Sequence, residues 1–246
     1  MTRTARTLIL TGAAIAAAAL PQPVQTAPAS RVLTATVPAS QFTHLDLRAL
    51  DGTVDLKADP NPAATNVTIS VALDPPRMKN FKKASPADPA TVAIDWTGDQ
   101  NVLRVALKNA GVGNIEAGWT ITVPARFSVR IDMHDGAIVV SGVAGGVDAS
   151  INSGLGSGRG SMDVDVPRGS LALSMGVGNI RASRANTDFS SAVVRATVGD
   201  AALYLLGHEI VAPHEPGPGH KVKLDGKGPD TLRIDVSVGD VSLKIG

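Results

Sequence analysis

The chain has 246 residues, of which 23 are Lys or Arg, 22 are Asp or Glu and none is Cys. The absence of Cys excludes disulfides, thiolate metal sites, cysteine nucleophiles and lipid attachment at a lipobox cysteine. Without Arg3 and Arg6 of the leader described next, 21 basic residues remain against 22 acidic ones. This balance predicts no general attraction to nucleic acid, and an aromatic content of 3% is low for stacking on bases or sugars.

Residues 1–29 have the character of an export signal. Arg3 and Arg6 form a basic start, residues 8–20 form a short apolar run rich in Ala, and a polar stretch containing Pro follows. Such a run is too short to span a bilayer. Cleavage is expected at Ala27-Pro28-Ala29, which starts the mature chain at residue 30, or at Ala17-Ala18-Ala19. We therefore expect an exported protein, periplasmic, on the cell surface or extracellular, with no transmembrane segment after signal removal.

Residues 30–123 form an irregular first half with β character. One clean unit, LDLRALDGTVDLKA, surrounds Gly52, and alternating apolar and polar residues predict further strands in ATNVTISVAL, ATVAIDW and NVLRVALKN. The intervening segment PPRMKNFKKASPADP is predicted to be a loop or a projecting hairpin, because its prolines cannot donate ladder hydrogen bonds. Its basic cluster is either a solvated loop or a contact with an anionic surface such as lipid headgroups or acidic glycans; the cluster comprises Arg77, Lys79, Lys82 and Lys83.

Residues 124–246 repeat one pattern, which is clearest in VRIDMHDGAIVVSG. Apolar and polar residues alternate on both sides of a glycine, which is typical of a strand, a corner and a second strand. Glycine suits the corner because it adopts a positive φ without steric cost, and a neighbouring Asp or Asn stabilises a tight turn. The glycines that fit this frame are Gly52, Gly136, Gly154, Gly178, Gly199 and Gly239.

The intervals between these glycines favour stacked units. They are 18, 24 and 21 residues from Gly136 to Gly199, then 40 to Gly239, close to two periods, and 84 back to Gly52, about four periods. A recurring interval of about 20 residues is typical of units that stack on one another. We predict an all-β fold, a β-solenoid forming one elongated domain at residues 30–246, with a two-sheet β-sandwich as the alternative. The residues expected to point inward are Val129, Ile131, Ile138, Leu171, Leu173, Ile180, Val194, Leu203, Leu232, Ile234, Val241 and Leu243.

Charged residues of both signs recur six and four positions before the repeat glycines: Asp46, Arg48, Arg130, Asp132, Asp148, Arg195, Arg233 and Asp235. They are interpreted as solvated ladders of cross-strand pairs.

Asp163 and Asp165 lie two residues apart on a predicted strand, so their carboxylates share one face. Polysaccharide hydrolases and lyases use such paired acids, although no aromatic platform accompanies this pair in the sequence.

Two further motifs carry candidate chemistry. His208, His214 and His220 lie in GHEIVAPHEPGPGH, which lacks the H-E-x-x-H spacing, so they bind a metal only if the loop folds them together; an exposed connecting loop is the alternative. The run GLGSGRG precedes the predicted strand SMDVDV, whereas a phosphate-binding loop precedes a helix. We therefore assign no catalytic residue, cofactor or metal from the sequence.

The Val-Pro strand end in TITVPARFSVRIDMHDGAIVVSG, the following GGVDASINSGLG and the repeated glycine-centred units resemble the bacterial DUF4097 family of proposed adhesins, which is related to the toast-rack modules of envelope proteins. The resemblance covers most of residues 31–246 and is strongest over 118–207. It implies an exported, right-handed β-helix-like fold with an adhesive or envelope-sensing role. Members have no catalytic motif, so the resemblance implies no catalytic residue.

Two classes of function follow. The first is a non-enzymatic envelope or surface protein, an adhesin or interaction scaffold that binds another macromolecule, and a sensor domain of an envelope-stress system is compatible with it. The second is an enzyme acting on envelope polysaccharide through Asp163 and Asp165.

The last predicted strand, VSLKI, ends one residue before Gly246. We expect it to be an open edge that is either covered by the N-terminal half or used for self-association.

Overall fold

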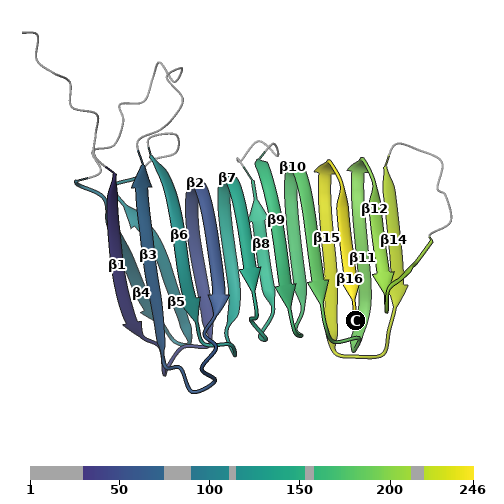
Figure 1. Cartoon of the computed structure of the whole chain (residues 1–246), viewed down its shortest axis with the longest axis horizontal. Helices are drawn as coiled ribbons and strands as arrows, with labels where there is room; N and C mark the ends of the chain where they lie inside the picture. Colours follow the sequence, from purple (N-terminus) through teal and green to yellow (C-terminus); the bar gives the residue numbers. More distant parts are fainter. Residues whose placement is uncertain (1–29, 75–89, 111–114, 153–157, 212–218) are drawn as a thin grey trace, which may run out of the picture.

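A computed structural model describes residues 30–74, 90–110, 115–152, 158–211 and 219–246. These ranges form an all-β protein without a helix (Figure 1). The strands are β1 (Arg31–Pro38), β2 (His44–Ala58), β3 (Asn66–Asp74), β4 (Ala93–Asp99), β5 (Val102–Lys108), β6 (Glu116–Val123), β7 (Ser128–Ser141), β8 (Val147–Ile151), β9 (Arg159–Val166), β10 (Leu171–Arg184), β11 (Phe189–Val198), β12 (Ala201–Leu205), β13 (His208–Glu209), β14 (His220–Asp225), β15 (Asp230–Val238) and β16 (Val241–Ile245).

Several sequence predictions concern segments beyond these ranges. The leader, the basic cluster of residues 77–83, Gly154 and His214 all lie outside the described residues. Within the described ranges, no helix has the length and apolar character needed to cross a membrane.

The strands occupy two layers that meet at a row of corners. β2, β7 and β10 each contribute to both layers: their first halves pair with β5, β8 and β15, and their second halves pair with β6, β9 and β16. We call the two sides the first layer (β4, β5, β8, β11, β14, β15 and those first halves) and the second layer (β1, β3, β6, β9, β12, β13, β16 and the second halves). Hydrogen bonds join all sixteen strands in one sheet that folds over itself, whereas a sandwich consists of two separate sheets.

A column of glycines lines the corner. Strand, corner and strand form a rung, and neighbouring rungs place their glycines side by side in the order Gly52, Gly136, Gly160, Gly178, Gly239 and Gly199. A methyl group on Gly178 would lie 1.9 Å from the carbonyl oxygen of Gly160, and Gly178 has a φ of +139°. The same space therefore has no room for a side chain and holds a backbone that side chains disfavour. Gly160 also lies in this column, whereas the predicted corner glycine Gly154 lies outside the described residues.

The order of rungs in space differs from their order in the chain. Gly52 and Gly136 are direct neighbours across the β2 and β7 pair, so the 84 residues between them do not hold stacked repeats, as the spacing had suggested. The intervening strands β3 to β6 instead extend the layers outward from β2. At the other end, β15 and β16 insert between β10 and the β11 and β12 rung, so the 40-residue interval is also not two stacked periods.

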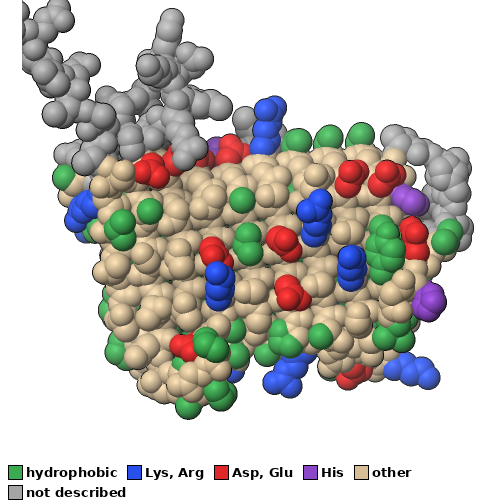
Figure 2. All heavy atoms as spheres, in the orientation of Figure 1, with side chains coloured by type: hydrophobic (Ala, Val, Ile, Leu, Met, Phe, Trp, Pro, Cys, Tyr) green, Lys and Arg blue, Asp and Glu red, His purple; other side chains and the backbone are tan. Residues whose placement is uncertain are grey.

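The core lies between the layers and is mainly aliphatic. All twelve residues predicted to point inward are at most 3% exposed, which confirms the alternation inferred from the sequence. Trp119, Phe42 and Phe127 are also fully buried, and all three precede the middle of β7. Among the described residues, charged side chains other than Arg184 lie on the outer faces (Figure 2).

The prediction for the final strand is wrong. β16 pairs in parallel with β10 on one side and with β12 on the other, so it is an interior strand and not an edge. The N-terminal half does not cover it either, because β1 lies at the opposite end of the sheet (Figure 1). Self-association through this strand is therefore excluded in the folded chain. The insertion of the last rung between two earlier ones is the physical reason.

A buried arginine fastens the start of this inserted rung. Arg184 at the end of β10 is 1% exposed, and its Nη2 forms an ion pair with Asp230 at the start of β15. Its Nε also donates to the carbonyl oxygen of Gly169 at 3.2 Å, and its Nη2 donates to that of Asp188 at 3.0 Å. Because the buried charge is paired and hydrogen-bonded, the cost of its desolvation is compensated. These contacts also join the end of β10 to the segments that contain Gly169, Asp188 and Asp230.

The glycine column makes a prediction about stability. Gly178→Ala should lower the free energy of unfolding by about 3 kcal/mol or more, because the new methyl group meets backbone and the residue has a positive φ. Gly207→Ala is the matched control, since Gly207 also has a positive φ but no atom lies within 4 Å of the added methyl group. Its expected cost is about 1 kcal/mol. Equal costs for the two variants in denaturant unfolding would contradict steric exclusion at the column.

The interior position of β16 makes a second prediction. Truncation after Asp240 removes the buried side chains of Val241, Leu243 and Ile245, each contributing roughly 2 kcal/mol, and exposes the edges of β10 and β12. We expect a much lower melting temperature and aggregation detected by light scattering. A hydrophilic tag appended after Gly246 keeps β16 in place and should leave both properties unchanged. A truncated protein as stable as the full chain would show that β16 is dispensable.

Candidate functional site

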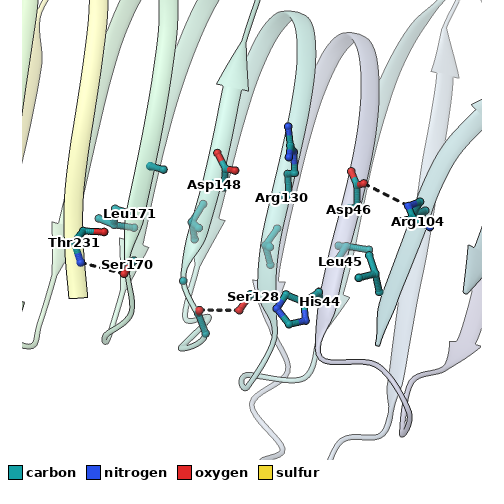
Figure 3. Close-up of a pocket in the computed structure, with 16 residues that line it drawn as sticks. His44, Leu45, Asp46, Arg104, Ser128, Arg130, Asp148, Ser170, Leu171 and Thr231 are labelled. Carbon is teal, nitrogen blue, oxygen red and sulfur yellow. Dashed lines mark hydrogen bonds and ion pairs between the residues drawn. The ribbon is translucent and has the colours of Figure 1, made fainter. Parts of the chain in front are cut away.

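A groove crosses the outer side of the first layer near the ends where its strands begin. Its cavity volume is about 440 Å³, and it runs over β5, β2, β7, β8, β10 and β15. Core residues such as Leu45 and Leu171 form its base, while His44, Ser128, Ser170 and Thr231 line the side toward the loops (Figure 3). At about 4.8 Å between strands, these six strands span roughly 24 Å. The groove is therefore long and shallow.

Four charges of alternating sign lie in one row along the groove. The strand registers place Arg104, Asp46, Arg130 and Asp148 opposite one another on β5, β2, β7 and β8 (Figure 3). Arg104 Nε lies 3.8 Å from Asp46 Oδ2, and Arg104 Nη1 lies 3.0 Å from Asp99 Oδ2 on β4. The two arginines and the two aspartates balance, so the row favours a partner that carries both charges or many polar groups over a polyanion.

Three carboxylates lie near Arg130, one of the two cations of this row. Its Nε donates to Asp132 Oδ2 at 3.2 Å, and its side chain is 58% exposed. Asp132, by charge and hydrogen bond, followed by Asp148 and Asp46, raises the pKa of the Arg130 guanidinium above its usual value. Ser150 Oγ also donates to Asp132 Oδ1 at 2.9 Å, which holds that carboxylate in place. Arg130 is thus a fixed, permanently charged and solvent-accessible donor.

A hydrogen-bonded group of polar side chains stands at one end of the groove. Asn101 Nδ2 lies 3.2 Å from both His44 Nδ1 and Thr43 Oγ1, and Thr43 Oγ1 lies 2.8 Å from His44 Nδ1. Because an amide nitrogen only donates, Asn101 Nδ2 donates to Thr43 Oγ1, and His44 Nδ1 can accept from it in the tautomer that carries the ring proton on Nε2. All three residues are exposed, and they offer hydrogen bonds to a ligand without the enclosed geometry of a nucleophile and base.

The second layer offers a different surface. Exposed or half-buried hydroxyl groups form two rows across β1, β3 and β6, and their registers place Thr34, Ser70 and Thr120 in one row and Thr36, Thr68 and Thr122 in the next. In Figure 2 the charged side chains gather further along this face, and the part over these strands is largely uncharged. The repeated Thr-x-Thr or Thr-x-Ser spacing in these three strands is the sequence signal for the two rows, because alternate residues of a strand share one face.

Asp163 and Asp165 share the outer face of β9 and are exposed. Asp165 Oδ1 accepts a hydrogen bond from Ser183 Oγ on β10, while Asp163 stands opposite Arg181 and Val139 on the neighbouring strands. Neither aspartate lines the groove or the cavities beside Arg48, Ser174 and Tyr204. The pair therefore lies on an open face, on the layer that does not carry the groove.

The structure describes two of the three histidines in GHEIVAPHEPGPGH. His208 in β13 is exposed, His220 opens β14, and His214 is outside the described ranges. Among described residues, the group with metal-ligand spacing does not include either of them. Of the charged residues that the repeat frame placed on the outer side, Asp46, Arg130 and Asp148 line the groove. Arg104, Ser170 and Thr231 also line it, but they come from outside that frame and were missed.

No family model and no curated protein matches this chain. A candidate cell adhesion protein of known structure from Clostridium sporogenes ATCC 15579 aligns with 89% of this chain and 100% of its own, with a TM-score of 0.53 and 12% sequence identity. A candidate adhesin from Bacteroides fragilis NCTC 9343 has 12% identity, coverage of 90% and 100%, and a TM-score of 0.35. One from Parabacteroides merdae ATCC 43184 has 13% identity, coverage of 87% and 96%, and a TM-score of 0.32. The likeness to the Clostridium protein concerns the fold.

Proposed function

We propose that this chain is an exported, non-enzymatic cell-envelope or surface protein, an adhesin or interaction scaffold that binds another macromolecule along the groove of its first layer. In this proposal residues 1–29 are a removed signal peptide, and residues 30–246 are a single elongated β-solenoid related to the DUF4097 adhesins. The protein then acts in the periplasm, on the cell surface or outside the cell.

The observation that carries this proposal is the groove with its alternating charges. An extended row of Arg104, Asp46, Arg130 and Asp148 on rigidly paired strands suits a long polar ligand that runs across the rungs. Among the residues lining the groove, His44 carries the single ring, so recognition relies on hydrogen bonds and ion pairs rather than on stacking. The fold likeness to a candidate cell adhesion protein agrees with a binding role.

The enzymatic alternative has weaker support. Acid and base catalysis on a polysaccharide needs two carboxyl groups that converge on a substrate in a cleft. Asp163 and Asp165 are exposed on an open strand face, and Asp165 is engaged by Ser183. A sensor domain remains compatible with the proposal, because it too needs only a binding face.

Binding to the envelope tests the proposal. Fluorescently labelled residues 30–246 should bind isolated cell envelopes of the producing bacterium, and Arg104→Glu with Arg130→Glu should weaken binding by about tenfold or more, because both exposed cations of the groove are reversed. Arg181→Glu with Lys244→Glu makes the same charge change on the second layer and should leave binding unchanged. Equal losses in the two double variants, or no binding by the unmodified protein, would contradict the proposal.

The same incubations separate the enzymatic alternative. Release of soluble sugar from the envelopes should be absent with the unmodified protein. Release that Asp163→Asn with Asp165→Asn abolishes would establish catalysis and overturn the non-enzymatic assignment.

A further inference from the structure

Three side chains with metal-binding atoms converge at the corner between β2 and β7. His134 Nδ1 lies 2.9 Å from Asp51 Oδ1 and 3.5 Å from Asp135 Oδ2, and one ligand atom from each residue lies within 4.8 Å of the other two. Asp51 and His134 are 83 residues apart in the chain. This corner is separate from the groove on the first layer, and no residue of the cluster lines the groove.

The backbone fixes this arrangement. Asp51 stands opposite Asp135 in the parallel pairing of β2 and β7, and the adjoining residues Gly52 and Gly136 are neighbours in the glycine column. A methyl group on Gly136 would lie 1.9 Å from the Gly52 carbonyl oxygen, so the two rungs are in close backbone contact beside the cluster. The carboxyl groups of the two aspartates are therefore held on adjacent rungs by the register itself.

Hydrogen bonding orients one of the carboxylates. The backbone N–H of Arg159 donates to Asp135 Oδ1 at 2.6 Å, which leaves Oδ2 as the oxygen nearer His134. The side chains of His134, Asp51 and Asp135 are 28%, 21% and 43% exposed. The cluster is thus partly shielded, with one side open to solvent. A hydrogen bond to a ligating carboxylate, such as the one from the Arg159 N–H to Asp135, stabilises the orientation of that metal ligand.

The donor set and the distances suit a transition-metal ion. Zinc bonds to imidazole nitrogen and carboxylate oxygen at about 2.0–2.2 Å, so two neighbouring ligand atoms around one ion lie roughly 3 to 3.5 Å apart. The 2.9 Å and 3.5 Å separations in this cluster are close to that range. Calcium and magnesium select sets of oxygen ligands, whereas a mixed set containing imidazole favours zinc, copper or nickel.

We propose that Asp51 Oδ1, His134 Nδ1 and Asp135 Oδ2 form a binding site for a divalent transition-metal ion of the zinc class. Three protein ligands leave a position that faces solvent, which water or a donor group from a partner fills. The ion joins β2 to β7, the pair through which the irregular strands β1 to β6 attach to the regular rungs. It therefore acts as a clamp between the two halves, independently of any ligand in the groove.

Zinc titration of the metal-free protein tests this site. Residues 30–246, treated with chelator and then dialysed, should bind one zinc ion in calorimetric titration with ZnCl₂, and added zinc should raise the melting temperature because the ion binds the folded state. His134→Gln should weaken zinc binding by about tenfold or more and remove the thermal shift. His44→Gln is the matched control, because His44 is an exposed histidine on the first layer and should retain both effects.

A carboxylate variant and a second ion complete the experiment. Asp135→Asn keeps the side-chain shape and should also weaken zinc binding, which guards against misfolding of the His134 variant. CaCl₂ should give a smaller thermal shift than ZnCl₂. Absence of zinc binding by the unmodified protein, or unchanged affinity in a folded His134→Gln or Asp135→Asn variant, would overturn the site. A larger effect of calcium would overturn the assignment to the zinc class.

Discussion

The close contact of backbone at the corner glycines is the constraint on which the rest of the structure depends. At each step of the column the carbonyl oxygen of one glycine occupies the space that a side chain of the next would need: Gly52 against Gly136, Gly160 against Gly178, and Gly178 against Gly239. Because glycine has no side chain, the chain can turn from one layer to the other while neighbouring rungs remain at hydrogen-bonding distance. Once the corners are aligned, the register of both layers is fixed, and so are the rows of side chains on the outer faces.

Local pattern was sufficient to predict the strands and their buried sides. Alternation depends only on neighbouring residues, so Ile131, Leu173 and Ile234 could be assigned to the core without knowledge of the partner strands. The order of the rungs could not be obtained in this way. An interval of 84 residues is compatible with four stacked units between the two glycines. It is equally compatible with strands that extend elsewhere before the chain returns to pair β7 directly with β2, which is what the structure has. The same ambiguity hid the inserted position of β16.

The candidate sites depend on that missing order. Asp46, Arg130 and Asp148 were recognised as outward-facing residues, but a groove required the knowledge that β5 and β8 lie beside β2 and β7. In the same way, Asp51 and Asp135 each precede a repeat glycine in the sequence, and only the direct pairing of their rungs brings both carboxylates to His134. Arg184 was unremarkable in the sequence because the acceptors that allow its burial come from distant segments, including Asp230.

The ends of the sheet bear on how such a protein meets a partner. β1 and β4 at one end and β14 at the other each pair in antiparallel fashion with a single neighbour, so their outer sides are edges within the described structure. β14 carries Lys221 and Lys223, and charged side chains on an edge strand disfavour the addition of another strand. The two long faces, by contrast, present fixed rows of charges and hydroxyl groups whose spacing is set by the glycine column. Recognition through a face, with side chains already in place, therefore fits this architecture better than strand addition at an end.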